Sequence, residues 1–60
     1  MNEVLKLRKK LGLSQDAFAA KLGIAPYTVR RWERELVVPS PLSLKAIEVI
    51  FGIKLDIKQK

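Results

Sequence analysis

The sequence lacks the two residue types on which most metal sites and many active sites depend. Its 60 residues include no cysteine and no histidine. Without cysteine, neither a disulfide framework nor a cysteine-type zinc site can form. Without histidine, the commonest general base and the commonest metal ligand are both missing. We therefore expect no metal site and no cofactor.

Carboxylates are sparse as well. The sequence has six acidic residues, and they do not cluster along the chain (Glu3, Asp16, Glu33, Glu35, Glu48, Asp56). No nucleophile and base can be paired from these residues without histidine or cysteine. We therefore expect a protein that is not an enzyme and has no small-molecule substrate.

Long apolar runs are also missing. The longest uninterrupted run extends only from Ala17 to Ala20. This is far too short to cross a membrane, and the N-terminal stretch MNEVLKLRKK has no apolar core of the kind found in signal peptides. We expect a cytoplasmic protein without a membrane partner, in contact with the nucleoid if the source is bacterial.

What the sequence does contain is an excess of positive charge. Twelve lysines and arginines face six acidic residues, which gives a net charge of +6. A basic domain suits nucleic acid, an anionic membrane surface or an acidic protein, and composition alone does not choose among them. The whole chain, residues 1–60, is expected to form one small domain with a thin core.

Apolar periodicity and capping residues predict four helices, over residues 3–11, 15–22, 26–35 and 41–51. Asn2, Ser14 and Ser40 are the expected N-caps, and Gly12 and Gly23 are expected to end the first two helices. The side chains expected to face the core are Val4, Leu7, Leu11, Phe18, Leu22, Val29, Trp32, Leu36, Leu42, Leu44, Ile47, Ile50 and Phe51.

The third helix is expected to have two different faces. At about 100° per residue, Val29, Trp32 and Leu36 share the side that faces the core. The opposite side carries one aromatic ring and three positive charges (Tyr27, Arg30, Arg31, Arg34). On an arbitrary helix such arginines are usually just a solvated face.

The C-terminal tail follows a different pattern. Residues 53–58 alternate between apolar and charged, which is typical of a strand. A single strand is not stable alone, so this segment either pairs with something or frays. One pairing is an antiparallel contact across the two-fold axis of a homodimer, through Ile53, Leu55 and Ile57.

The stretch GLSQDAFAAKLGIAPYTVRRWER resembles the helix-turn-helix of the phage repressor and Cro-type DNA-binding family. The matching positions are Gly12, Leu13, Ser14, Gln15, Ala19, Gly23, Trp32 and Glu33. The likeness covers roughly residues 4–51, with the motif itself at 14–34. It implies an all-α, lambda repressor-like domain of four helices with a short extended tail. The second motif helix would lie in the major groove of double-stranded DNA.

The resemblance also implies roles for individual residues. It places Pro26, Tyr27, Thr28 and Arg31 at base edges, and we assign Arg30 on the same helix to the bases too. Contacts to the DNA backbone are assigned to Ser14, Gln15, Lys21 and Arg34. Arg8 and Glu33 match positions that form a partly buried ion pair in relatives.

Two departures from the family pattern stand out. Glu35 occupies a position where most relatives have glycine, so either the helix continues or Glu35 adopts a left-handed conformation. The following loop, usually basic, is the apolar Leu36-Val37-Val38. Such a segment either packs against the last helix or forms an exposed partner contact.

The function that this sequence predicts is sequence-specific binding to double-stranded DNA, as a transcriptional regulator of the repressor type. The alternative is a protein-interaction module of the same fold, of the antitoxin or coactivator-bridge type. In that case Val37, Val38 and the tail would form the contact.

Overall fold

The structure is a computed structural model that describes residues 2–57 of the chain, so Lys58 of the alternating tail lies outside the described residues. Its four helices are α1 (Glu3–Lys10), α2 (Gln15–Leu22), α3 (Pro26–Glu33) and α4 (Pro41–Phe51), and residues 2–57 contain no strand. The predicted all-α fold is confirmed. Helices α1 and α3 end slightly earlier than the periodicity indicated.

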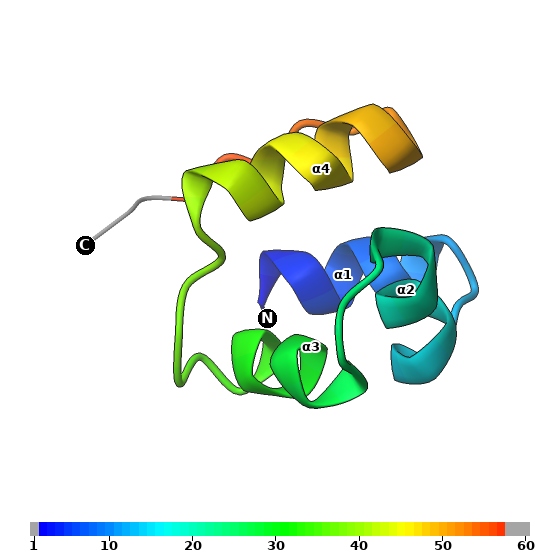
Figure 1. Cartoon of the computed structure of the whole chain (residues 1–60), viewed down its shortest axis with the longest axis vertical. Coiled ribbons are helices and arrows are strands. Elements are labelled where there is room, and N and C mark those ends of the chain that lie inside the picture. The colour runs from blue at the N-terminus through cyan, green and yellow to red at the C-terminus, as the bar shows by residue number, and fades with distance from the viewer. Residues whose placement is uncertain (1, 58–60) are drawn as a thin grey trace.

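The helices surround a single small core (Figure 1). Helix α2 packs against both α3 and α4, and α1 packs against α3. In the view of Figure 1, α3 and α4 lie on opposite sides of the molecule, with α1 between them. The outer faces of α3 and α4 therefore point in different directions. The longest helix has 11 residues, and no helix within residues 2–57 is long and apolar enough to cross a bilayer.

Side-chain caps begin three of the helices. The Asn2 side chain accepts hydrogen bonds from the Val4 and Leu5 amides, and Ser14 and Ser40 cap α2 and α4 in the same way. These bonds satisfy amides that have no partner inside a helix. The Asn2 side chain also makes a second contact, which capping patterns do not predict. Its Nδ2 donates a hydrogen bond to the Trp32 carbonyl at 2.9 Å. The start of α1 is thereby tied to the end of α3.

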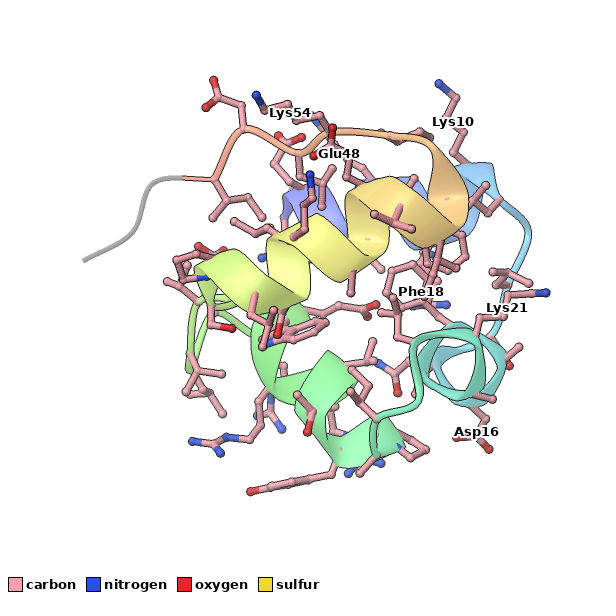
Figure 2. All side chains as sticks on the ribbon, turned by 45° about the horizontal axis from the view of Figure 1, so that its top comes forward. Lys10, Asp16, Phe18, Lys21, Glu48 and Lys54 are labelled. Atoms are coloured by element: carbon pink, nitrogen blue, oxygen red, sulfur yellow. The ribbon has the colours of Figure 1, made fainter. Side chains whose placement is uncertain are left out.

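All four helices contribute to the core. Its buried side chains are Val4, Leu7, Phe18, Ala19, Val29, Trp32 and Ile47. Phe18 points from α2 toward α4 (Figure 2), where its ring stacks on Phe51 with the ring centroids 4.9 Å apart. Ala19 is small enough to let α2 and α3 approach closely. Helix α3 is thus held by one face, and its other face remains available.

Four side chains expected in the core are in fact exposed. Leu36 is 63% exposed, Leu42 81% and Ile50 46%, and Leu11 is exposed as well. Leu11 and Leu36 lie beyond the last helical residues, Lys10 and Glu33, so the helical periodicity no longer directs them inward. Leu42 and Ile50 lie on flanks of α4 that no other helix covers.

The tail is extended and lies along the domain. Ile53, Leu55 and Ile57 are half-buried and pack against the core, whereas Lys54 and Asp56 are exposed. The apolar residues of the alternating pattern therefore lie on the side of the extended segment that covers the core, and the charged residues lie on the other side. The segment is stabilised through its side chains rather than by a ladder of backbone hydrogen bonds.

Candidate nucleic-acid interface

The turn between α2 and α3 sets the geometry of the candidate interface. Gly23 adopts a left-handed conformation with φ of 73°, which costs little only because glycine has no Cβ. The Gly23 amide donates to the Ala20 carbonyl at 3.2 Å, and the Ile24 amide to the Ala19 carbonyl at 3.0 Å. This is the Schellman arrangement that ends helices. Ile24 then packs against the core, which fixes the direction in which α3 leaves the turn.

Helix α3 presents the predicted base-contacting residues on its accessible sides. Val29 and Trp32 are buried, while Tyr27 is 61% exposed. The structure brings the predicted base-contacting residues and Arg34 together on this one helix and its C-cap: Pro26, Tyr27, Arg30 and Arg34 are exposed, and Thr28 and Arg31 are half-buried. Within this group the Arg31 guanidinium carbon lies over the Tyr27 ring, 5.6 Å from its centroid.

The start of α3 has no side-chain cap. Its N-cap residue is Ala25, whose side chain offers no hydrogen-bond acceptor, and Pro26 follows at the first helical position. Both residues are exposed. The positive end of the α3 dipole therefore faces solvent, as an approaching phosphate would require.

The other end of α3 is fixed by Arg8. Its Nε donates to Glu33 Oε2 at 2.5 Å, and its Nη2 donates to Glu33 Oε1 at 3.0 Å. The side chains of Arg8 and Glu33 are only 15% and 6% exposed. Arg8 Nη1 also donates to the Leu13 carbonyl at 2.9 Å, a contact that no sequence pattern indicated. One arginine thus joins α1, the loop before α2 and the last residue of α3.

The surroundings of Glu33 keep it ionised. Burial raises the pKa of the Glu33 carboxyl, but the hydrogen bonds from Arg8 and Gln15 lower it, as do the positive charges of Arg8 and Lys9. The net pKa therefore lies below its ordinary value. The same hydrogen bond to Glu33 raises the pKa of Arg8. The pair is therefore charged at neutral pH and holds α3 by a charge-assisted, two-point contact.

The predicted backbone-contacting residues do not form one cluster. Ser14 caps α2, and Gln15 Nε2 donates to Glu33 Oε1 at 3.0 Å, so Gln15 braces α3 directly. Lys21 extends from the far end of α2 (Figure 2), and Arg34 is the exposed C-cap of α3. Their contacts with DNA stay predictions.

The structure resolves both departures from the family pattern. Glu35 adopts the left-handed conformation with φ of 60°, the amides of Glu35 and Leu36 donate to Trp32 and Arg31 carbonyls, and α3 ends there. Glu35 thus occupies the position that glycine fills in the same motif after α2. Val37 packs against the core and Val38 is half-buried, which agrees with packing rather than with an exposed contact.

Within the described residues 2–57 there is no group of three or more acidic side chains that could hold a metal ion. The accessible face of α3 carries positive charge and hydrogen-bond donors from Arg30, Arg31 and Arg34.

Comparison with known proteins agrees with this geometry. Comparison with curated proteins and with solved structures gave no match. The sequence profile of the helix-turn-helix family, in contrast, matches residues 4–58, which is nearly the whole chain. This chain therefore belongs to the helix-turn-helix family of DNA-binding domains, of the Cro and lambda repressor type.

Proposed function

We propose that this protein binds double-stranded DNA sequence-specifically, with α3 in the major groove. The observation that carries the proposal is the exposed face of α3, where Tyr27, Arg30 and Arg34 lie together with the half-buried Arg31. The opposite face is buried, and Glu33 is fixed by Arg8 and Gln15. A rigid helix that presents arginines in this way can place them against base edges without first being ordered.

Within this proposal the contacts divide into two groups. Pro26, Tyr27, Thr28, Arg30 and Arg31 contact base edges, since they lie along α3. Ser14, Gln15, Lys21 and Arg34 contact the sugar–phosphate backbone, and the open N-terminus of α3 adds a further phosphate contact. Backbone contacts set affinity and register, whereas base contacts set specificity.

The biological role that follows is regulation of transcription, by repression. A domain that occupies its DNA site competes with other proteins for that site, so binding alone is enough to repress. In a bacterial cell such a protein would work in the cytoplasm, at the nucleoid.

We further propose that two copies pair through the tail, so that two recognition helices meet successive major grooves about 34 Å apart. Within the described part of the tail, residues 53–57, no backbone hydrogen bond is found. Unpaired backbone groups of an extended segment favour addition of another strand. In antiparallel pairing centred on Leu55, Lys54 of one copy would face Asp56 of the other, and opposite charges in that position stabilise the pair.

One observation favours the alternative of a protein-interaction module. Leu42, Val49 and Ile50 are exposed on α4, and α4 lies on the opposite side of the molecule from α3 (Figure 1). An apolar surface in that place would suit a protein partner better than DNA. The two functions differ in their response to duplex DNA, which makes them easy to separate.

The experiment is titration of random duplexes at several salt concentrations, followed by selection of bound duplexes from the same pool. We expect binding that weakens steeply between about 50 and 200 mM salt, with a log–log slope of about −0.9 per neutralised phosphate. Selection should return one consensus, palindromic if the protein binds as a dimer. Negligible binding at low salt, despite the charge of +6, would support the interaction module instead. Salt-dependent binding without a consensus would contradict sequence-specific recognition.

A further inference from the structure

Two residues of the proposed base-contacting group touch each other before any DNA is present. The Arg31 guanidinium carbon lies 5.6 Å from the centroid of the Tyr27 ring. This is within the distance at which a cation is attracted to the face of an aromatic ring. The two residues are four apart in α3, which places them one helical turn from each other on the same side.

Arg31 differs in this respect from the arginines around it. Arg30 and Arg34 are exposed, whereas Arg31 is half-buried and lies over the ring. Free arginine side chains lose much conformational freedom when they bind, and a ring beneath the guanidinium removes part of that freedom beforehand. A cation–π contact uses none of the guanidinium N–H groups as hydrogen-bond donors, so these groups remain available to a base edge.

The same contact restricts what the pair can meet in a major groove. Arginine binds a guanine with two hydrogen bonds, to O6 and N7, when its guanidinium lies near the plane of that base. Successive bases along a strand are about 3.4 Å apart. A ring centred 5.6 Å from the guanidinium carbon lies between one and two base steps away, within reach of the neighbouring base. The apolar group that a pyrimidine offers there is the 5-methyl group of thymine.

We propose that Tyr27 and Arg31 read DNA as one unit, whose target is a guanine next to a thymine. Tyr27 is the positioning residue for Arg31, and its own ring covers the thymine methyl group. This proposal rests on the proposed function of duplex binding by α3. It goes further in naming the dinucleotide and in making the guanine preference of Arg31 depend on Tyr27.

Base analogues test the contacts with the unaltered protein. After selection from a random pool, the consensus should contain adjacent guanine and thymine. Replacing that guanine by 7-deazaguanine removes only N7, and replacing that thymine by deoxyuridine removes only the methyl group. We expect losses of about tenfold and about threefold in affinity, in keeping with single base contacts. A consensus without this dinucleotide, or full affinity for both analogues, would overturn the proposal.

Variants then test whether the two residues act together. Tyr27→Phe keeps the ring, so the tenfold loss with 7-deazaguanine should persist. Tyr27→Ala removes the ring that positions Arg31, so the affinity that this variant loses with 7-deazaguanine should be only about twofold. If Tyr27 only contacted the thymine and did not position Arg31, Tyr27→Ala would still lose affinity about tenfold with 7-deazaguanine. That result would overturn the coupling. Far-UV circular dichroism checks that each variant is folded, which we expect because Tyr27 is largely exposed.

The outcomes separate this inference from the function on which it rests. If the unaltered protein bound no duplex, the proposed function would fail, and the reading unit with it. If the protein bound a selected duplex but Tyr27→Ala kept the full response to 7-deazaguanine, only the reading unit would fail.

Discussion

Arg8 in α1 binds both carboxylate oxygens of Glu33, the last residue of α3, with its Nε and Nη2 atoms. A guanidinium and a carboxylate in this two-point geometry fix each other's direction as well as their distance. Gln15 binds Glu33 Oε1 as well, so three segments meet at one carboxylate. The helix that presents the candidate DNA-binding residues is thereby fixed at the end farthest from the turn.

Breaking this pair should destabilise the domain strongly. Arg8→Ala or Glu33→Ala leaves one charge buried without its partner, and we expect a loss of about 3 kcal/mol in the free energy of unfolding. Domains of this size rarely have more than about 3–5 kcal/mol in total. The double variant Arg8→Met with Glu33→Leu should lose clearly less than the sum of the two single losses. Urea denaturation followed by circular dichroism measures these values.

The control for that experiment is the surface pair of Lys6 and Glu3, whose charged atoms are 3.5 Å apart. Because both side chains are exposed, Lys6→Ala should cost less than about 1 kcal/mol. Single losses at Arg8 and Glu33 that are equally small, or that add up in the double variant, would contradict the structural role of the pair.

The Glu33 carboxylate should also make stability depend on pH. Because its pKa is lower in the folded than in the unfolded protein, the unfolded state binds a proton more readily. The stabilisation is fully present above the unfolded value of about 4.3, and it is lost as pH falls through the folded value. Thermal unfolding between pH 3 and 7 should show this loss. The unfolding temperature of Glu33→Gln should vary less with pH than that of Asp56→Asn, which removes an exposed tail carboxylate. Equal pH dependence of the two variants would contradict this assignment.

Glu35 should be a position where one substitution stabilises the domain. Its φ of 60° places a residue with a Cβ in the left-handed region, where glycine is favoured. We expect Glu35→Gly to add about 0.5–1 kcal/mol, since relief of strain outweighs the greater freedom of the unfolded chain. For a domain of this length that is a rise of about 4–8 °C in Tm by calorimetry. Glu35→Ala removes the charge but keeps the Cβ, so it should not reproduce the gain.

Arg34 should contribute to affinity without contributing to specificity. Arg34→Ala removes one phosphate contact, so it should weaken binding to all duplexes evenly and reduce the salt slope by about 1. Lys45 is exposed on α4, which lies across the molecule from α3 (Figure 1), so Lys45→Ala removes the same charge away from α3 and should leave the slope unchanged. Fluorescence anisotropy over a range of salt concentrations measures both. Identical effects of the two variants would mean that only the net charge matters.

The tail pairing predicts a charge-swap result. Lys54 and Asp56 are exposed, so exchanging them should not disturb the core. Lys54→Glu would place like charges opposite each other in both halves of the pair and should weaken dimerisation about tenfold. Adding Asp56→Lys should restore it. Sedimentation velocity over a range of concentrations measures the masses, and a monomer at every concentration in the unaltered protein would exclude the dimer.

Helical periodicity predicts which side chains are buried only as far as the helix continues. Val29 and Trp32 face the core as their spacing indicates, yet Leu36 follows the same spacing and is exposed. The difference arises at Glu35, where the left-handed conformation ends α3 and turns the chain away. From the sequence, Glu35 could either continue the helix or adopt the left-handed conformation. The left-handed conformation is adopted because the chain must turn after α3 to reach α4.

Sequence by itself determined the four helices and which face of α3 is apolar. Those features depend on hydrogen bonds and caps within four residues, as at Ser14 and Gly23, and on a repeat that every helix obeys. Tertiary structure alone decided which surfaces are covered. It placed the tail against the core and left Leu42 and Ile50 exposed. These outcomes depend on which segments meet in space, because burial is decided by neighbours that are distant in the chain.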